Sequence, residues 1–318
     1  MAKERAWDLL DKAAIKRDRR SYAVELYEAA KKATKTSLCY SAAKAIAERR
    51  RERRRVAIAT GFNLLVGDRV RCETDGPVGA VALAYVLSID GWEVALAADE
   101  YSSSVLEALV AAAGLSADVY AFPLEYEEAE EAAKSFLKLV KPSVIVAVER
   151  PGWNAKGVHH DMRGRSVSGF NAPLDLLFLK ARESGITTIG IGDGGNEIGM
   201  GAIREFVAEV VPYGRICSCP CRGGIASAVE TDFLVVGSVS NWAAYALAGA
   251  YCLLRKTDYP YTAELDAKLL RAAVRSGAVD GLLKRESLSV DGASVEECKG
   301  VVARVAKIVN SNTVISHR

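Results

Sequence analysis

The chain has 318 residues, of which 50% are hydrophobic and 26% are charged, and its formal net charge at pH 7 is +2. This composition is typical of a globular protein with a sizeable core, and it excludes a disordered or fibrous chain. Because the positive and negative totals nearly balance, the net charge favours neither nucleic acid nor a membrane surface as a partner.

The first ten residues already include Lys3, Glu4, Arg5 and Asp8. They match neither the apolar core of a secretory signal nor an acid-poor transit peptide, so we expect a cytoplasmic protein. The seven cysteines are not spaced as a disulfide framework, which favours a reducing compartment. The absence of glutamine and the presence of only three methionines favour a thermophilic source.

Residues 1–54 form a predicted N-terminal helical segment, with apolar stripes at helical spacing. We expect these helices to wrap the rest of the chain or to form an oligomer contact. The third helix, near residues 37–53, ends in an arginine-rich run that continues to residue 55. Positive charge complements the carboxyl end of a helix, so we interpret the run as a solvated helix end rather than a nucleic-acid site.

Residues 55–318 form a predicted α/β catalytic domain, because short β-branched runs alternate with amphipathic helices. The pattern predicts a doubly wound, mostly parallel sheet flanked by helices. The expected strands are 56–60, 93–97, 119–122, 143–148, 187–191 and 233–236. The expected helices are 78–87, 103–113, 125–140, 174–183, 197–208 and 241–254, with two more after residue 262. An uncharged run over 233–254 is long enough to span a bilayer, but polar residues interrupt it, so we interpret it as a buried strand followed by a buried helix.

Ligands of open parallel sheets bind beyond the carboxyl ends of the strands, so the loops after strands are the candidate sites. The first loop runs over 73–80 and contains the acid Asp75. Gly76 allows close backbone approach before Pro77 opens a helix, which predicts free N–H groups for an anion. The fourth loop, 237–242, offers Ser240 and Asn241, which are either substrate contacts or helix caps.

The second loop, 149–164, is long and polar, as functional loops often are. It begins with the acid Glu149, and Arg150 and Arg163 are natural clamps for a carboxylate or phosphate. Ion pairing within the loop is the alternative role for both arginines. His159 and His160 are adjacent, so we expect at most one of them to face a site.

The third loop, Gly-Asp-Gly-Gly-Asn-Glu over 192–197, is the densest signal. Glycines at 190, 192 and 195 match a dinucleotide-binding spacing, but the carboxylate of Asp193 would repel a pyrophosphate. Asp193, Asn196 and Glu197 at the start of a helix suit an amine or a metal ion better. A tight turn with an N-cap and a first-turn acid is the structural alternative.

Cys217, Cys219 and Cys221 alternate, and on a strand they would face the same side. Three thiols can converge on a soft metal, but the sequence shows no evident fourth ligand. We therefore favour small buried side chains or an incidental disulfide.

The loops, taken in order, carry four motifs: Glu-Thr-Asp-Gly-Pro (73 to 77), Glu-Arg-Pro-Gly (149 to 152), Gly-Asp-Gly-Gly-Asn-Glu-Ile-Gly-Met-Gly (192 to 201) and Val-Ser-Asn-Trp (239 to 242). Over residues 56 to 255 the chain thereby resembles the D-glutamate cyclase family. The resemblance implies conversion of D-glutamate to 5-oxo-D-proline with release of water and without a nucleotide. Trp153 stands where the family pattern has Arg, and Asp161 where it has Asn. If the missing Arg clamps a carboxylate, this chain prefers a different acid or uses Arg150 or Arg163.

A mechanism that fits these residues needs two acid/base groups and anion-binding groups. We expect Asp193 and Glu197 to receive the ammonium, one of them as the base, and Asp75 or Glu149 to be the protonated acid. Arg150 or Arg163 and the backbone amides after Gly76 and Gly194 would bind the carboxylates. The remaining expected substrate contacts are Asn154, Gly195, Asn196, Ser240 and Asn241.

Other functions stay open at the level of sequence. Asp75, Asp193 and Glu197 are candidate ligands of Mg²⁺ or Mn²⁺, although the cyclisation itself requires no cofactor. A related carboxylate- or phosphometabolite-binding enzyme is the main alternative, and a non-catalytic ligand-binding or nucleic-acid-associated protein that uses the arginine run is a third. We expect a small amino acid as the partner, no nucleic acid, no membrane, and a homo-oligomer as one option.

Overall fold

Six strands form one parallel sheet in this computed structural model, which describes residues 2–16 and 22–313. The strands are β1 (Arg55–Thr60), β4 (Glu93–Asp99), β5 (Asp118–Phe122), β6 (Val144–Val148), β7 (Thr187–Gly192) and β8 (Phe233–Val236). All six were predicted to within two residues at each end. Their order is β5-β4-β1-β6-β7-β8, and β1 pairs with β4 on one side and β6 on the other. The strand order therefore reverses between β1 and β6, and a crevice opens there at the carboxyl ends.

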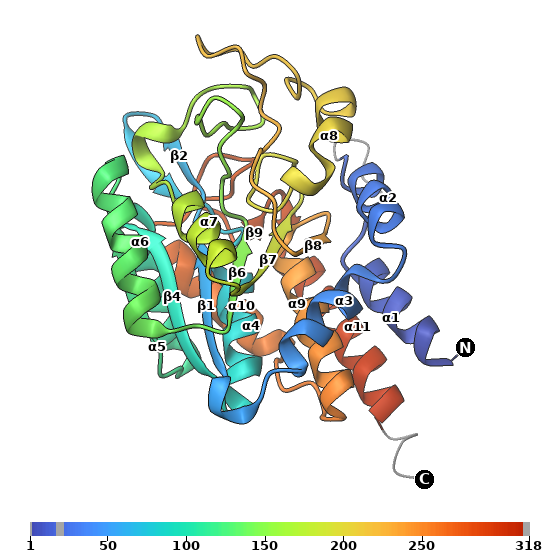
Figure 1. The fold of residues 1–318 in the computed structure, drawn as a ribbon. Helices are drawn as coiled ribbons and strands as arrows, with labels where there is room; N and C mark the ends of the chain where they lie inside the picture. The colour runs from blue at the N-terminus through green and yellow to red at the C-terminus, as the bar shows by residue number, and fades with distance from the viewer. Residues whose placement is uncertain (1, 17–21, 314–318) are drawn as a thin grey trace.

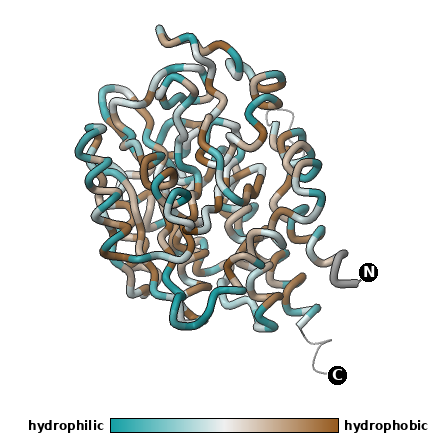
Figure 2. Tube along the Cα trace, viewed as in Figure 1, coloured by the Kyte–Doolittle hydropathy of each residue, from teal (hydrophilic) through white to brown (hydrophobic). Residues whose placement is uncertain are grey.

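Helices cover both faces of the sheet, as the doubly wound prediction requires (Figure 1). On one face Val56 and Ile58 share a core with α4 (Pro77–Ile89), α5 (Glu100–Ala113), α9 (Ser240–Arg255), α10 (Ala263–Arg275) and α11 (Val295–Thr313). On the other face Ala57 and Ala59 pack with α6 (Tyr126–Val140) and α7 (Asp175–Glu183). Figure 2 shows the hydrophobic residues concentrated in this layered interior.

The uncharged run over 233–254 forms β8 and α9, as predicted. Helices α4 and α9 are buried on nearly every side, which explains why neither has a polar face in its sequence. Within 2–16 and 22–313, none of the helices has the length and apolarity needed to cross a membrane.

The N-terminal segment contains α1 (Ala2–Ala13), α2 (Ala23–Thr34) and α3 (Leu38–Ala47). Ala13, Ala42 and Ile46 belong to the same core as α9 and α11, so α1 and α3 are continuous with the α/β core.

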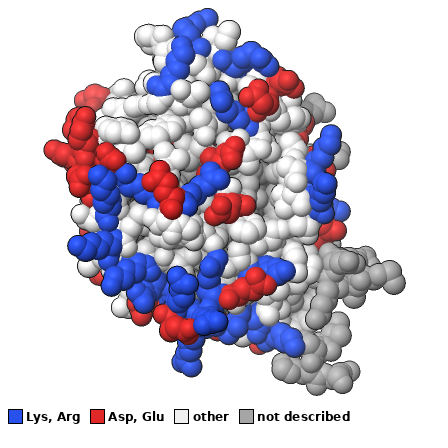
Figure 3. Space-filling view, in the orientation of Figure 1, with Lys and Arg blue, Asp and Glu red and all other residues white. Residues whose placement is uncertain are grey.

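The arginine-rich run does not continue the third helix, contrary to the prediction. Helix α3 ends at Ala47, and η1 (Arg51–Arg53), a short 3-10 turn, leads into β1. Arg54 pairs with Asp90 at 3.3 Å, close to the amino ends of the strands and opposite the crevice. In Figure 3 basic side chains gather along the lower edge of the molecule, where the amino ends of the strands lie.

The predicted helix over 197–208 is wrong over residues 197–203, and only residues 204–208 are α-helical. Residues 197–200 form isolated β-bridges with Pro151 and Glu230, and they are followed by η3 (Gly201–Ile203) and the short α8 (Arg204–Val210). Gly199 has a φ of +104°, which no α-helix accommodates.

Two hairpins and one short turn were missed by the sequence analysis. They are β2 (Asn63–Val66) with β3 (Arg69–Cys72), β9 (Ser289–Val290) with β10 (Ala293–Ser294), and η2 (Ser168–Phe170). The strands of both hairpins are only two to four residues long, too short for a clear alternating pattern.

Candidate active site

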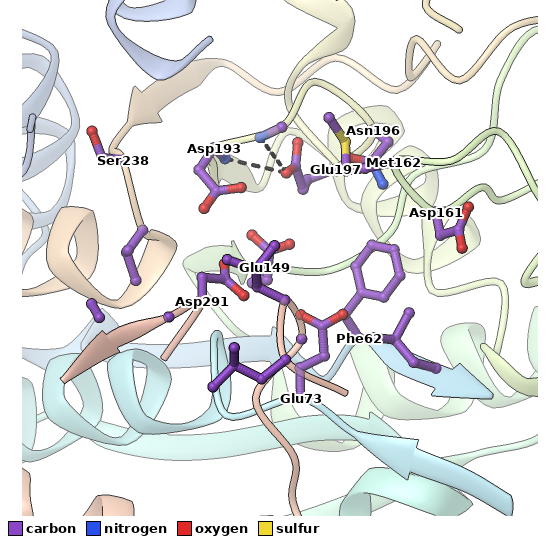
Figure 4. Close-up of a pocket in the computed structure, with 18 of the residues that line it drawn as sticks. Phe62, Glu73, Glu149, Asp161, Met162, Asp193, Asn196, Glu197, Ser238 and Asp291 are labelled. Atoms are coloured by element: carbon purple, nitrogen blue, oxygen red, sulfur yellow. Dashed lines mark hydrogen bonds between the residues drawn. The ribbon is translucent and has the colours of Figure 1, made fainter. Parts of the chain in front are cut away.

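A cavity of about 800 Å³ lies over the carboxyl ends of the central strands. Its wall includes Phe62 after β1, Glu149 after β6 and Asp193 after β7 (Figure 4). Glu73 and Asp291 reach the same space from loops outside the sheet (Figure 4). The cavity thus occupies the crevice that the strand order creates, and carboxylates dominate its wall.

Glu197 anchors the glycine-rich loop from within. Its side chain is fully buried, and its carboxylate accepts the backbone N–H groups of Asp193 (3.2 Å), Gly194 (2.7 Å) and Gly195 (2.8 Å). The protein's own carboxylate therefore fills the anion cradle that these amides form. Substrate binding by the amides of Gly194 and Gly195 was expected, but the structure shows these amides already occupied.

The glycines in and before this loop allow it to pack closely against β7. A Cβ at Gly190 would lie 2.4 Å from the carbonyl oxygen of Ile198, and a Cβ at Gly192 would lie 2.9 Å from the carboxylate of Glu197. Gly195 has a φ of +100°. The spacing that resembles a dinucleotide motif is thus explained by a loop folded back on its own strand.

Asp193 is the free acid of the loop. Its half-buried carboxylate faces the cavity and accepts no hydrogen bond from any residue in the described part of the chain. Burial raises the pKa of this carboxyl well above its usual range, and the nearby carboxylates of Asp75 and Asp291 raise it further. Asp193 is therefore suited to hold a proton at neutral pH.

Glu149 stands beside it in the cavity wall, as its position after β6 predicts. One carboxylate oxygen from each of Glu149, Asp193 and Glu197 lies within 4.8 Å of the others. The Ser240 hydroxyl donates to Glu149 at 2.6 Å, and the pKa of Glu149 is raised by burial and then by Asp193. Two adjacent acids with raised pKa values favour a shared proton.

Asp75 lies deeper and joins the starts of α4 and α9. It accepts backbone N–H groups from Gly76 (2.9 Å), Ser240 (2.9 Å) and Asn241 (2.8 Å), and burial raises its pKa to about 6. The Asn241 amide oxygen accepts N–H groups from Gly76 (2.9 Å) and Gly79 (2.6 Å). The backbone amide of Gly76 is therefore occupied by Asp75 and Asn241, contrary to the expected anion site. The Asn241 side chain caps the start of α4, not that of its own helix α9, which has no side-chain cap.

Asp291 was missed by the sequence analysis, although it is central to the site. It lies within 4.8 Å of Asp75 and Asp193, measured between carboxylate oxygens. With Gly292 it forms the two-residue turn between β9 and β10, and both residues have positive φ, +47° and +78°. An Asp-Gly pair is a strong hairpin signal, so this turn was recognisable from the sequence. The position of the turn beside the carboxyl ends of the parallel strands was not.

The cationic residues of the cavity wall include Arg163 and Lys284. Asp161 holds the loop that carries Arg163, since it accepts the backbone N–H groups of Arg163 and Arg165 at 3.0 Å. Burial lowers the pKa of Lys284, and the positive charges of Arg165 and Arg163 lower it further. Lys284, which the sequence analysis did not identify, thus shares a basic region with Arg163.

Arg150 does not reach this region. Its side chain is fully buried, and it donates to the carbonyl of Gly61 (2.6 Å), to Asp99 (2.7 Å) and to the carbonyl of Ala172 (2.5 Å). It is absent from the described cavity wall, where the expected clamp would have to lie. Of the two predicted arginine clamps, Arg163 alone lines the cavity.

Asn154 and Trp153 also lie away from the cavity wall as described. The Asn154 amide donates to the carbonyl of Gly224 at 2.7 Å and organises its own loop. Trp153 stacks on Tyr126 with ring centroids 6.3 Å apart. The departure from the family pattern at position 153 therefore does not alter the described cavity wall.

The two adjacent histidines point apart, as predicted. The Nε2 of His159 lies 2.7 Å from a carboxylate oxygen of Asp175. The Nε2 of His160 lies 3.2 Å from the sulfur of Cys219. All seven cysteines are free, so the expected incidental disulfide is absent from the structure as described.

Two comparisons with known proteins agree on the relationship. The sequence model of the family described as D-glutamate cyclase-like, C-terminal, matches residues 14–306. The human protein named D-glutamate cyclase, mitochondrial, is 35% identical to the chain over 240 residues. The match covers 72% of this chain and 36% of the human protein, so the chain spans little more than a third of that relative's length.

Proposed function

The chain belongs to the D-glutamate cyclase-like family, and from this premise we propose that it is a lyase that converts D-glutamate to 5-oxo-D-proline and water. The observation that carries the proposal is the group formed by Glu149, Asp193 and Glu197 at the edge of the cavity. The name of the human relative supplies the substrate. The cavity volume of about 800 Å³ suits a small molecule.

The reaction joins the α-amino nitrogen of glutamate to its γ-carboxyl carbon and expels one γ-oxygen as water. The ammonium group loses two protons, and both end on the departing oxygen. The site therefore consumes no proton but must carry two of them over a short path.

Asp193 and Glu149 provide that path when they share one proton. Ionised Asp193 takes a proton from the ammonium, and protonated Glu149 donates its proton to a γ-carboxyl oxygen as the C–N bond forms. Glu149 then recovers a proton from the nitrogen, while Asp193 protonates the departing hydroxyl and water leaves. Each acid accepts one proton and gives one back, so the pair returns to its starting state.

The other residues position the substrate and the loop. Glu197 holds the Asp193 loop through three backbone hydrogen bonds. Arg163 and Lys284 are the cationic partners of the substrate carboxylates. A substrate with one ammonium and two carboxylates matches a cavity that has both an acidic and a basic part.

The test is product formation by the purified chain. Incubated with D-glutamate, it is expected to release 5-oxoproline of D configuration, measured by chiral chromatography with mass detection. L-glutamate and solutions without enzyme are the controls. Absence of product from D-glutamate, with the protein shown to be folded by circular dichroism, would refute the proposed reaction.

A divalent cation is a second arrangement that the acids favour. The expected ligands Asp75, Asp193 and Glu197 do not form one group; they fall into two groups that share Asp193. Because Asp75 and Glu197 already accept backbone N–H groups, Asp193 is the most available ligand for Mg²⁺ or Mn²⁺, with Asp291 beside it in one group and Glu149 beside it in the other. Such an ion would act as a Lewis acid on the γ-carboxyl. Turnover that survives exhaustive chelation excludes this arrangement.

A further inference from the structure

Three cysteines and one histidine converge outside the candidate active site. The sulfur of Cys217 lies 3.6 Å from that of Cys219 and 3.3 Å from that of Cys221. The Nε2 of His160 lies 3.2 Å from the Cys219 sulfur and 3.4 Å from the Cys221 sulfur. All four atoms lie within 4.8 Å of one another.

These four atoms are arranged as the ligands of one tetrahedral metal ion. Zn–S bonds of about 2.3 Å and a Zn–N bond of about 2.0 Å place neighbouring ligand atoms about 3.5 to 3.8 Å apart. The observed separations are slightly shorter, but they are far above the roughly 2.05 Å of a disulfide. We propose that His160, Cys217, Cys219 and Cys221 form a structural zinc site of the Cys₃His type.

The fourth ligand, His160, could not be identified from the sequence alone. His160 precedes Cys217 by 57 positions, and only the fold brings the loop after β6 against the segment after α8. The cysteines lie in an irregular loop rather than on the strand that their alternation suggested. His159 turns the opposite way, toward Asp175.

The surroundings favour thiolate ligands. The sulfur of Cys221 accepts the backbone N–H of Gly223 at 3.3 Å and the side-chain amide of Asn154 at 3.5 Å. Donors of this kind stabilise a metal-bound thiolate and orient it. His160 and Cys217 are buried, while Cys219 and Cys221 are half-buried, as expected for a closed site near the surface.

The segment that carries the cysteines has no regular secondary structure. No helix or strand occurs between Val210 and Phe233, and the 22 intervening residues are held by irregular backbone hydrogen bonds and by the packing of residues such as Val211 and Ile225. A structural zinc ion would add binding energy to this irregular segment.

The site also connects to the cavity wall. Gly164, next to Arg163, accepts backbone N–H groups from Ser218 (3.0 Å) and Cys219 (3.1 Å). The carbonyl of His160 accepts the side-chain amide of Asn196 at 2.7 Å. A zinc ion here would fix the loop of Arg163 against the acidic loop, without contacting substrate. The zinc proposal stands on these contacts alone and does not depend on the cyclase reaction.

The direct test is the metal content of the full chain, purified with a reducing agent and without chelators. Mass spectrometry of metals is expected to find about one zinc per chain. Replacement of the zinc by Co²⁺ is expected to give the thiolate-to-metal absorption of a tetrahedral site. Wild-type protein with neither zinc nor the cobalt spectrum, and with its thiols free or in a disulfide, overturns the proposal.

Variants locate the ion. Cys219→Ser is expected to lose zinc and the cobalt absorption, whereas Cys252→Ser, in the remote α9, retains both. Asp193→Asn is also expected to retain the zinc, because it alters only the acidic cavity. Loss of zinc from Asp193→Asn with retention in Cys219→Ser would place the ion in the cavity and refute the Cys₃His site. If Cys219→Ser does not fold, the wild-type metal content and cobalt spectrum still decide.

Discussion

Glu197 and Asp193 lie four residues apart in the same acidic group, but their carboxylates have different surroundings. Glu197→Gln removes a carboxylate that accepts three backbone N–H groups in a fully buried place. A hydrogen bond to a charged group contributes about 1.5 to 3 kcal/mol, and an unsatisfied buried donor costs about 1 to 3 kcal/mol. Glutamine keeps one acceptor oxygen and turns an NH₂ group toward the remaining donors. We expect a loss of about 2 to 4 kcal/mol in unfolding free energy from these bonds.

Asp193→Asn is the matched control for this loss. It replaces an ionisable carboxyl in the same group of acids by a neutral amide and breaks no described hydrogen bond. Its stability should therefore equal or exceed that of the wild type, because like-charge repulsion falls. The difference between the two variants isolates the backbone bonds of Glu197.

The assay is urea unfolding at pH 7, followed by circular dichroism, with the slope of the transition compared among the three proteins. Hydrogen exchange of the amides of residues 193–195 independently measures how strongly the hydrogen bonds to Glu197 protect the loop. A gap below about 0.5 kcal/mol between Glu197→Gln and Asp193→Asn would contradict the anchoring role, since this is the size of an ordinary surface substitution.

Three further predictions concern the charge of the site and the residues around it. Because burial raises the pKa of Asp193 and brings that of Asp75 to about 6, the folded state binds more protons than the unfolded state. The melting temperature should then fall as pH rises from 5.5 to 8, with a smaller slope in Asp193→Asn; an equal slope would show that Asp193 does not titrate in this way. Asn241→Ala leaves the N–H group of Gly79 without its acceptor and should lower the unfolding free energy by about 1 to 3 kcal/mol, measured by urea titration. Arg163→Ala should raise the KM for D-glutamate about tenfold with kcat changed only a few-fold, and an unchanged KM would remove Arg163 from substrate binding.

The parallel sheet was predictable because its strands are short, apolar and bounded by polar loops. The residues of β6 are all buried, so their hydrophobic run carries the strand signal without help from distant contacts. The position of the site followed from the same reasoning, since Glu149 and Asp193 come directly after β6 and β7.

The failures arose where a side chain or a distant segment overrides the local pattern. Residues 197–208 have helical spacing, but the carboxylate of Glu197 captures the amides before it, and Gly199 takes a positive φ. Arg150 follows Glu149 directly in the chain, but the backbone of Glu149 is left-handed, with φ +44°. The side chain of Glu149 lines the cavity, whereas that of Arg150 points to Asp99. Neither effect is visible in a hydrophobic pattern.

Long-range partners explain the rest. Asp291 reaches Asp75 and Asp193 from a hairpin near the end of the chain, and His160 reaches the cysteines across 57 positions. Their residue types carry chemistry, but one sequence does not reveal which distant residues meet.

The central claim is that Asp193 exchanges protons with the amine of glutamate while Glu197 only holds the loop. The most direct measurement is the turnover of D-glutamate by wild type and Asp193→Asn, at equal concentrations of folded protein. We predict formation of 5-oxoproline by the wild type and a kcat lower by about 10² to 10⁴ in the variant. Full turnover by folded Asp193→Asn would contradict the account.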